Sequence, residues 1–228
     1  MVPQPTISVN KLAESIVSKA ARKRKILMDR KYPDPDFSMG AYHRESSEAI
    51  QLYIGGGAVD TAPLDRAHGI LNQQTPTKIG TMRRISSNIG SIERFYEMLD
   101  DIDLKGAEPE LGPSNSPKLK IHNVEVSVRP EIILRGIGPK GAHCVGAIKL
   151  HMSKSDNFNE EAAGYASALL QEYTRQFLVQ DGEIVQPLYC QVIDVGNRKV
   201  FPGVKATAQR MKDIEAECQN IFGLWPTL

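Results

Sequence analysis

The chain has few cysteines and no long apolar run, and each absence excludes a class of protein. Its three cysteines, Cys144, Cys190 and Cys218, are odd in number and far apart. They therefore predict neither a C-x-x-C zinc site nor an even disulfide framework, and we expect them to be small buried side chains. No apolar stretch approaches the roughly 20 residues that span a bilayer. We therefore expect no membrane partner.

An excess of charge and the common catalytic motifs are also missing. The net charge is +1, from 28 Lys and Arg against 27 Asp and Glu, so any surface for nucleic acid must be local. The first residues do not place a basic segment before an apolar one, so we expect no secretory signal and a cytoplasmic protein. We find no G-x-S-x-G, H-E-x-x-H or dinucleotide fingerprint, and the glycine-rich loop 136–141 lacks the Gly-Lys-Ser/Thr of a P-loop.

What is present predicts a helical first part and a mixed α/β second part. Apolar residues recur at helical spacing after Asn10, within 41–54 and 61–71, and from Ile85 to Leu99. Residues 105–117 concentrate Gly, Pro, Ser and Asn, which is typical of a linker. We therefore expect a mainly helical subdomain at 1–104, a linker at 105–117 and an α/β core at 118–228.

Two strands joined by the glycine-rich loop are the most informative stretch of this core. Val124, Val126 and Val128 alternate with polar residues, so we predict a strand that carries Glu131 on its polar face. Residues 144–152 predict a second strand, in which Ala147, Lys149 and His151 share one face. A helix capped by Asn159, a hairpin of strands 188–195 and 198–204 and a last helix follow. This order predicts an α/β (α+β) fold with a mixed sheet flanked by helices.

Pro130-Glu131 followed by Ala147-Ile148-Lys149 resembles the motif of the PD-(D/E)XK nuclease superfamily, in its RecB and lambda-exonuclease branch. The resemblance covers roughly residues 118–195. It implies a restriction-endonuclease-like core and metal-dependent hydrolysis of phosphodiester bonds in DNA. It also implies a role in a prokaryotic system of antiviral defence or DNA processing.

The resemblance assigns roles to individual residues. Glu131 would be a metal ligand for Mg²⁺ or Mn²⁺ and Lys149 the catalytic lysine. The second acid of the motif is replaced by Ala147, whose methyl group cannot bind a metal. Six residues are candidate replacements, with Glu48 favoured, namely Glu125, Asp194, Glu45, Glu48, His43 and His68. His151 would be a further ligand, better suited to Mn²⁺ than to Mg²⁺.

Two alternatives stay open. The site can be inactive, leaving a nuclease-fold subunit that binds DNA, a partner protein or another copy of itself. The pair of Glu131 and Lys149 can also be an ordinary salt bridge between neighbouring strands.

Basic residues in three places are candidates for binding nucleic acid. Arg22, Lys23 and Arg24 belong to a basic run, Lys140 lies in the glycine-rich loop, and Lys154 follows the second strand. Lys and Arg that neutralise phosphates supply most sequence-independent affinity for nucleic acid. The alternative for the basic run is a solvated helix face, and Arg83 and Arg84 are additional candidates for phosphate contacts.

Overall fold

The computed structural model describes residues 4–34, 39–156 and 158–228 and confirms an α+β fold with a mixed main sheet. Strands follow the order β2-β5-β6-β8-β9 in this sheet, and β7 pairs with β6. Their bounds are β2 (Glu108–Leu111), β5 (Ile132–Ile137), β6 (His143–His151), β7 (Glu183–Val185), β8 (Gln191–Asp194) and β9 (Lys199–Phe201). The pairs β2–β5, β5–β6 and β8–β9 are antiparallel, whereas β6 is parallel to β7 and β8.

A second, small sheet has the order β1-β4-β3. It is formed by β1 (Thr6–Ser8), β3 (Leu119–Ile121) and β4 (Val124–Ser127). Because β1 runs parallel to β4, residues 6–8 belong to the same layer as residues 119–127.

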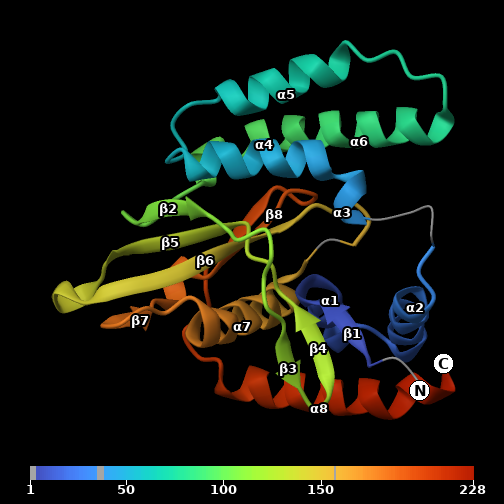
Figure 1. Ribbon diagram of the computed structural model, residues 1–228, viewed down its shortest axis with the longest axis vertical. Coiled ribbons are helices and arrows are strands. Elements are labelled where there is room, and N and C mark those ends of the chain that lie inside the picture. Colours follow the sequence, from blue (N-terminus) through green and yellow to red (C-terminus); the bar gives the residue numbers. More distant parts are fainter. Residues whose placement is uncertain (1–3, 35–38, 157) are drawn as a thin grey trace.

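Helices cover both faces of the main sheet (Figure 1). The helices are α1 (Val9–Val17), α2 (Ala20–Lys31), α3 (Met39–Tyr42), α4 (Arg44–Gly55), α5 (Ala62–Asn72), α6 (Ile79–Tyr96), α7 (Glu160–Phe177) and α8 (Ala208–Leu224). Short 3₁₀ segments lie at Leu99–Asp101, Pro139–Gly141, Pro187–Tyr189 and Trp225–Thr227. Among the described residues, no helix is both long and apolar enough to cross a membrane.

The main sheet separates two apolar clusters. Ile132, Leu134, Ile148 and Leu150 pack with α4, α5 and α6 on one face. Alternate residues of the same strands, with Ile133 and Ala147 among them, pack with α1, α7 and α8 on the other face. β5 and β6 are thus buried on both faces, which is why β5 carries a continuous apolar run and shows no alternation in the sequence.

Several elements predicted from sequence are confirmed. The Asn159 side chain caps α7 by accepting a hydrogen bond from the Ala162 amide at 2.8 Å. The predicted hairpin is present as β8 and β9. The predicted partition of the 144–152 strand is also correct, because Ile148 and Leu150 face one cluster while Ala147 faces the other.

The predicted strand carrying Glu131 was wrong in its extent. β4 ends at Ser127, and Arg129 adopts a positive φ of 45° before Pro130. The chain therefore leaves the small sheet and enters the main sheet at β5, so Glu131 precedes a new strand instead of ending the first one. The start of α1 was also misplaced, because Ser8 caps it in place of Asn10.

The subdomain boundary at 105–117 stays a prediction, but this segment contains secondary structure. Strand β2 lies inside the 105–117 segment and pairs with β5. Leu12 of α1 and Leu27 of α2 pack in the same cluster as α7 and α8. The first helices are therefore packed against the C-terminal part of the chain.

Candidate functional site

Glu131 and Lys149 form a buried ion pair on the face of the sheet that α7 covers. The Lys149 Nζ donates to Glu131 Oε1 at 2.6 Å and to the Arg129 carbonyl at 2.9 Å. The Leu150 amide donates to Glu131 Oε2 at 2.7 Å. Only 15% of the Glu131 side chain and 11% of the Lys149 side chain are exposed. Both carboxylate oxygens therefore have donors within the protein.

The environment of this pair opposes ionisation of the acid. Burial raises the pKa of Glu131, and the Lys149 ammonium and the Leu150 amide oppose that shift. A buried carboxylate left without these donors would be strongly disfavoured. The charge of Glu131 therefore depends on the Lys149 ammonium and the Leu150 amide.

Ala147 closes the position where the resemblance expects a second acid. It is fully buried, and it is paired in register with Ile133 of β5. Ala163 and Ala166 of α7 belong to the same apolar cluster. A carboxylate at this position would have to enter the core between sheet and helix.

His151 and Asp194 form a second buried pair, at the carboxyl ends of the parallel strands β6 and β8. They are register partners, and both are buried. His151 Nε2 donates to the Asp156 carbonyl at 2.6 Å, and its ring stacks on Phe158. Asp194 accepts hydrogen bonds from the amides of Phe158 and Asn197. These contacts attach the strand ends to the loops that follow them.

The pKa values of this second pair are shifted by the same cause. Burial lowers the pKa of His151, against the attraction of Asp194. Burial raises the pKa of Asp194, against its backbone hydrogen bonds and the attraction of His151. We therefore interpret His151 as a neutral imidazole that links β6 to the following loop.

The other candidate acids and histidines are dispersed. Glu125 lies in the small sheet and pairs with Lys118 at 2.5 Å, Glu48 lies 3.7 Å from Arg44, and Glu45 pairs with Arg84. His68 lies on α5, 3.5 Å from Glu93. Within residues 4–34, 39–156 and 158–228, no three His, Cys, Asp or Glu side chains are grouped closely enough to hold a metal ion. The predicted ligands Glu131, Glu48 and His151 are therefore not brought together.

The basic residues predicted to bind nucleic acid do not form one patch. Arg22 is paired with Glu14 at 2.5 Å and with Asp156 at 2.7 Å, and Lys23 is paired with Glu217 at 2.9 Å. Arg24 is exposed on α2.

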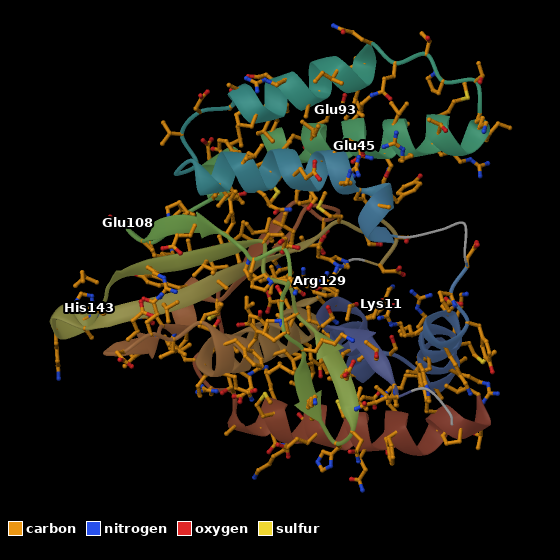
Figure 2. All side chains as sticks on the ribbon, in the orientation of Figure 1. Lys11, Glu45, Glu93, Glu108, Arg129 and His143 are labelled. Carbon is orange, nitrogen blue, oxygen red and sulfur yellow. The ribbon has the colours of Figure 1, made fainter. Side chains whose placement is uncertain are left out.

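Lys140 lies far from that helix. It belongs to the turn between β5 and β6, where its φ is 61°. This hairpin tip, marked by His143, lies at the opposite end of the molecule from Lys11 and the first helices (Figure 2).

A cavity of about 750 Å³ opens where the helical layer meets the loop after β6. Three segments line it: Tyr42 and His43 before α4, the first half of α6, and residues 153–155. The side chains that can donate to an anion are Tyr42, His43, Arg83, Ser87, Ser153, Lys154 and Ser155. No Asp or Glu is part of this lining among the described residues.

His43 is the buried member of this lining. It is 7% exposed, and its Nδ1 has no hydrogen-bond partner within the described part of the chain. Burial lowers the pKa of His43, and the nearby Arg94 and His151 lower it further. A neutral imidazole therefore lines the same cavity as Arg83 and Lys154. Lys154, Arg83 and His43 were candidates from sequence, whereas Ser87 and Ser155 carried no signal, because single serines have no characteristic spacing.

Comparison with known proteins adds no family to this geometry. No protein-family model matches the chain, and no curated protein matches it.

Proposed function

We propose that this chain is a nuclease-like protein that binds DNA without cleaving it, and that the cavity beside His43 holds a backbone phosphate. The observation that carries the proposal is the lining of this cavity. Two cationic side chains, three serine hydroxyls and a buried imidazole converge there without an acid among the described lining residues.

The chemistry of the lining favours a phosphate over other ligands. Arg83 supplies the planar donor set that suits phosphate oxygens, and Lys154 supplies a compact positive charge. Serine hydroxyls are common partners of the DNA backbone. Contacts of these kinds carry little sequence information, so we expect binding with weak sequence preference.

The absence of cleavage follows from the ion pair in the sheet. Both oxygens of Glu131 accept hydrogen bonds from Lys149 and Leu150, and Ala147 occupies the core where the motif has its second acid. The residues present do not fit a metal site of the nuclease type for Mg²⁺ or Mn²⁺.

Metal-dependent hydrolysis of DNA is the second candidate function. It is favoured by one observation, namely that Glu131 and Lys149 face each other at 2.6 Å, as the motif requires. Catalysis of this kind would need Glu131 to exchange Lys149 for a metal ion and another acid to approach. The proposed setting, prokaryotic defence or DNA processing, rests on the resemblance alone.

The test of binding measures anisotropy of labelled single- and double-stranded DNA. We expect Arg83→Gln and Lys154→Gln each to weaken binding at low salt by about tenfold. Each variant loses a charge-assisted hydrogen bond of about 1.5 kcal/mol, which corresponds to that factor. In a plot of log affinity against log salt concentration, each variant should also reduce the slope by about the value of one phosphate contact. Lys212→Gln on α8, an exposed residue outside the cavity, is the matched control. Unchanged affinity in both cavity variants would refute the proposal.

The test of catalysis uses the same DNA with Mg²⁺ or Mn²⁺. We expect the wild-type chain to leave the DNA intact. Cleavage that disappears in both Glu131→Gln and Lys149→Ala would reject the non-catalytic proposal and support the second candidate.

A further inference from the structure

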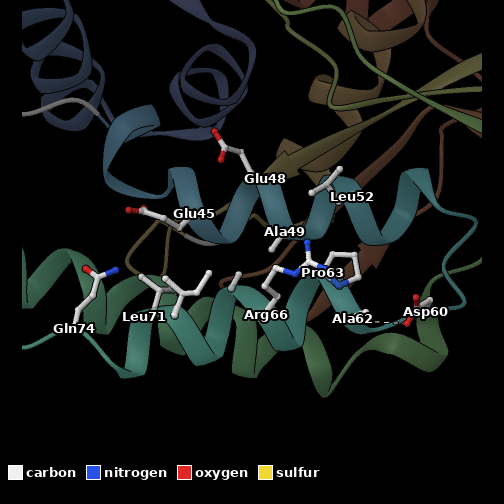
Figure 3. Close-up of a pocket in the computed structure, with 12 residues that line it drawn as sticks. Glu45, Glu48, Ala49, Leu52, Asp60, Ala62, Pro63, Arg66, Leu71 and Gln74 are labelled. Carbon is white, nitrogen blue, oxygen red and sulfur yellow. Dashed lines mark hydrogen bonds between the residues drawn. The ribbon is translucent and has the colours of Figure 1, made fainter.

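A groove of about 450 Å³ runs between α4 and α5, on the helical layer of the molecule (Figure 3). Its apolar lining consists of Ala49, Leu52, Ala62, Pro63, Ala67, Ile70 and Leu71. Leu52 is 52% exposed and Ile70 is 55% exposed, although both are large apolar side chains. Exposed apolar side chains that line a hollow are typical of a binding surface.

The dimensions of the groove suit a helix. α4 has 12 residues and α5 has 11, so each helix is about 16–18 Å long. A third helix laid between them would contact the groove over about three turns. Apolar side chains at i, i+3, i+4 and i+7 would then reach the lining, as in other complexes where a helix binds in a groove.

The charged side chains at the rim of the groove favour an occupant of opposite charge. Glu45, Glu48 and Asp60 line the groove, and Arg66 is the one basic residue among the described lining residues. One oxygen of Glu45 is paired with Arg84, whereas its Oε2 is buried and lacks a hydrogen-bond partner within the described residues. Glu48 is exposed and its contact with Arg44 is long, so that contact neutralises it weakly. A cationic occupant is therefore favoured, and a nucleic acid is disfavoured.

The most basic helix of the chain itself cannot fill this groove in a second copy. α2 carries the basic run, but its apolar residues Ile26 and Leu27 are buried in the core. Of its large apolar side chains only Met28 is exposed, so α2 offers no apolar stripe while the chain is folded. We propose that the groove binds an amphipathic helix of a partner protein, one that carries Lys or Arg beside its apolar stripe.

The test uses a synthetic helical peptide of Leu and Lys, about 15 residues long, with Leu at i, i+3, i+4 and i+7. A peptide with Glu in place of Lys is its counterpart. We expect the full-length protein to bind the Lys peptide at least tenfold more tightly than the Glu peptide, by fluorescence anisotropy at low salt. The double variant Glu45→Gln, Glu48→Gln should reduce that preference, whereas Glu93→Gln, on α6 outside the groove, should not.

The apolar contacts are tested by Leu52→Lys and Ile70→Lys, which we expect to weaken binding of the Lys peptide by tenfold or more. Ile79→Lys is the control, because Ile79 is also an exposed apolar residue, at 67%, but lies on α6 outside the groove lining. Thermal unfolding of each variant checks that it is folded. Equal binding of both peptides, or unchanged binding in both groove variants, would overturn the proposal. A concentration-dependent dimer that Ile70→Lys abolishes would overturn it in favour of a second copy.

Discussion

Replacing Lys149 by methionine tests whether the Glu131–Lys149 pair supports the fold. Lys149 is 11% exposed and donates to both Glu131 and the Arg129 carbonyl. Methionine keeps much of the apolar stem and removes the charge, so it leaves Glu131 buried without its cation. Breaking a buried pair in this way costs about 3–5 kcal/mol. The loss would be a large part of the roughly 5–15 kcal/mol that stabilises a typical domain.

The same variant should change how stability depends on pH. Burial raises the pKa of Glu131 in the folded chain, and Lys149 opposes this shift. A carboxyl group with a raised folded pKa holds its proton more tightly in the folded state, so its contribution to stability falls as pH rises through that pKa. Without Lys149 the folded pKa rises further. The free-energy difference between the variant and the wild type should therefore grow by about 1.4 kcal/mol per pH unit between the two folded pKa values.

Urea denaturation at pH 5 and at pH 8 measures both effects, with fluorescence of Trp225 as the signal. Trp225 is the one tryptophan of the chain and is buried in the folded state. Lys199→Met is the matched control, since Lys199 and Glu160 form a more exposed pair, which is worth less than about 1 kcal/mol. Adding Glu131→Gln to Lys149→Met should remove the extra dependence on pH. A loss no larger than that of Lys199→Met, or equal losses at both pH values, would refute the reasoning.

Two further predictions concern buried side chains. Ala147→Asp should lower the free energy of unfolding by about 3–5 kcal/mol, because it places an unpaired charge in the core. Ala147→Ser should lower it clearly less. A stable Ala147→Asp variant that cleaves DNA with Mg²⁺ would contradict this expectation. Burial raises the pKa of the Cys190 and Cys218 thiols to about 12, so a thiol reagent at pH 8 should react with them only after unfolding, and rapid labelling of the native protein would contradict the core that we describe.

The local signals in the sequence were sufficient where one short segment decides the outcome. Asn159 caps α7 because its side chain reaches the Ala162 amide three residues later. Ile148 and Leu150 separate from Lys149 and His151 because successive side chains of a strand point to opposite faces. The predicted contact of Glu131 with Lys149 is present at 2.6 Å. The alternation of the first strand is not its cause, because β4 ends at Ser127 and Glu131 lies just before β5.

The local signals failed where the chain changes sheet. The three valines of β4 and the acid Glu131 keep one alternation in the sequence, yet Arg129 and Pro130 turn the chain between them from the small sheet into the main one. β2 was missed within the expected linker because an edge strand needs few apolar residues, and its burial is slight. Neither feature has a period that a single segment could reveal.

The two surfaces proposed for binding were decided by tertiary packing. The cavity joins residues 42–43, 80–87 and 153–155, and the groove joins α4 to α5, so each depends on segments that meet only after the core has formed. Periodicity and capping act within a few residues, so the sequence alone predicted helices, strands and which of their faces are buried. Contacts between distant segments decide which donors converge on one cavity and whether Arg22 faces solvent or Glu14. Those contacts form because the two apolar clusters are buried on the two faces of the sheet.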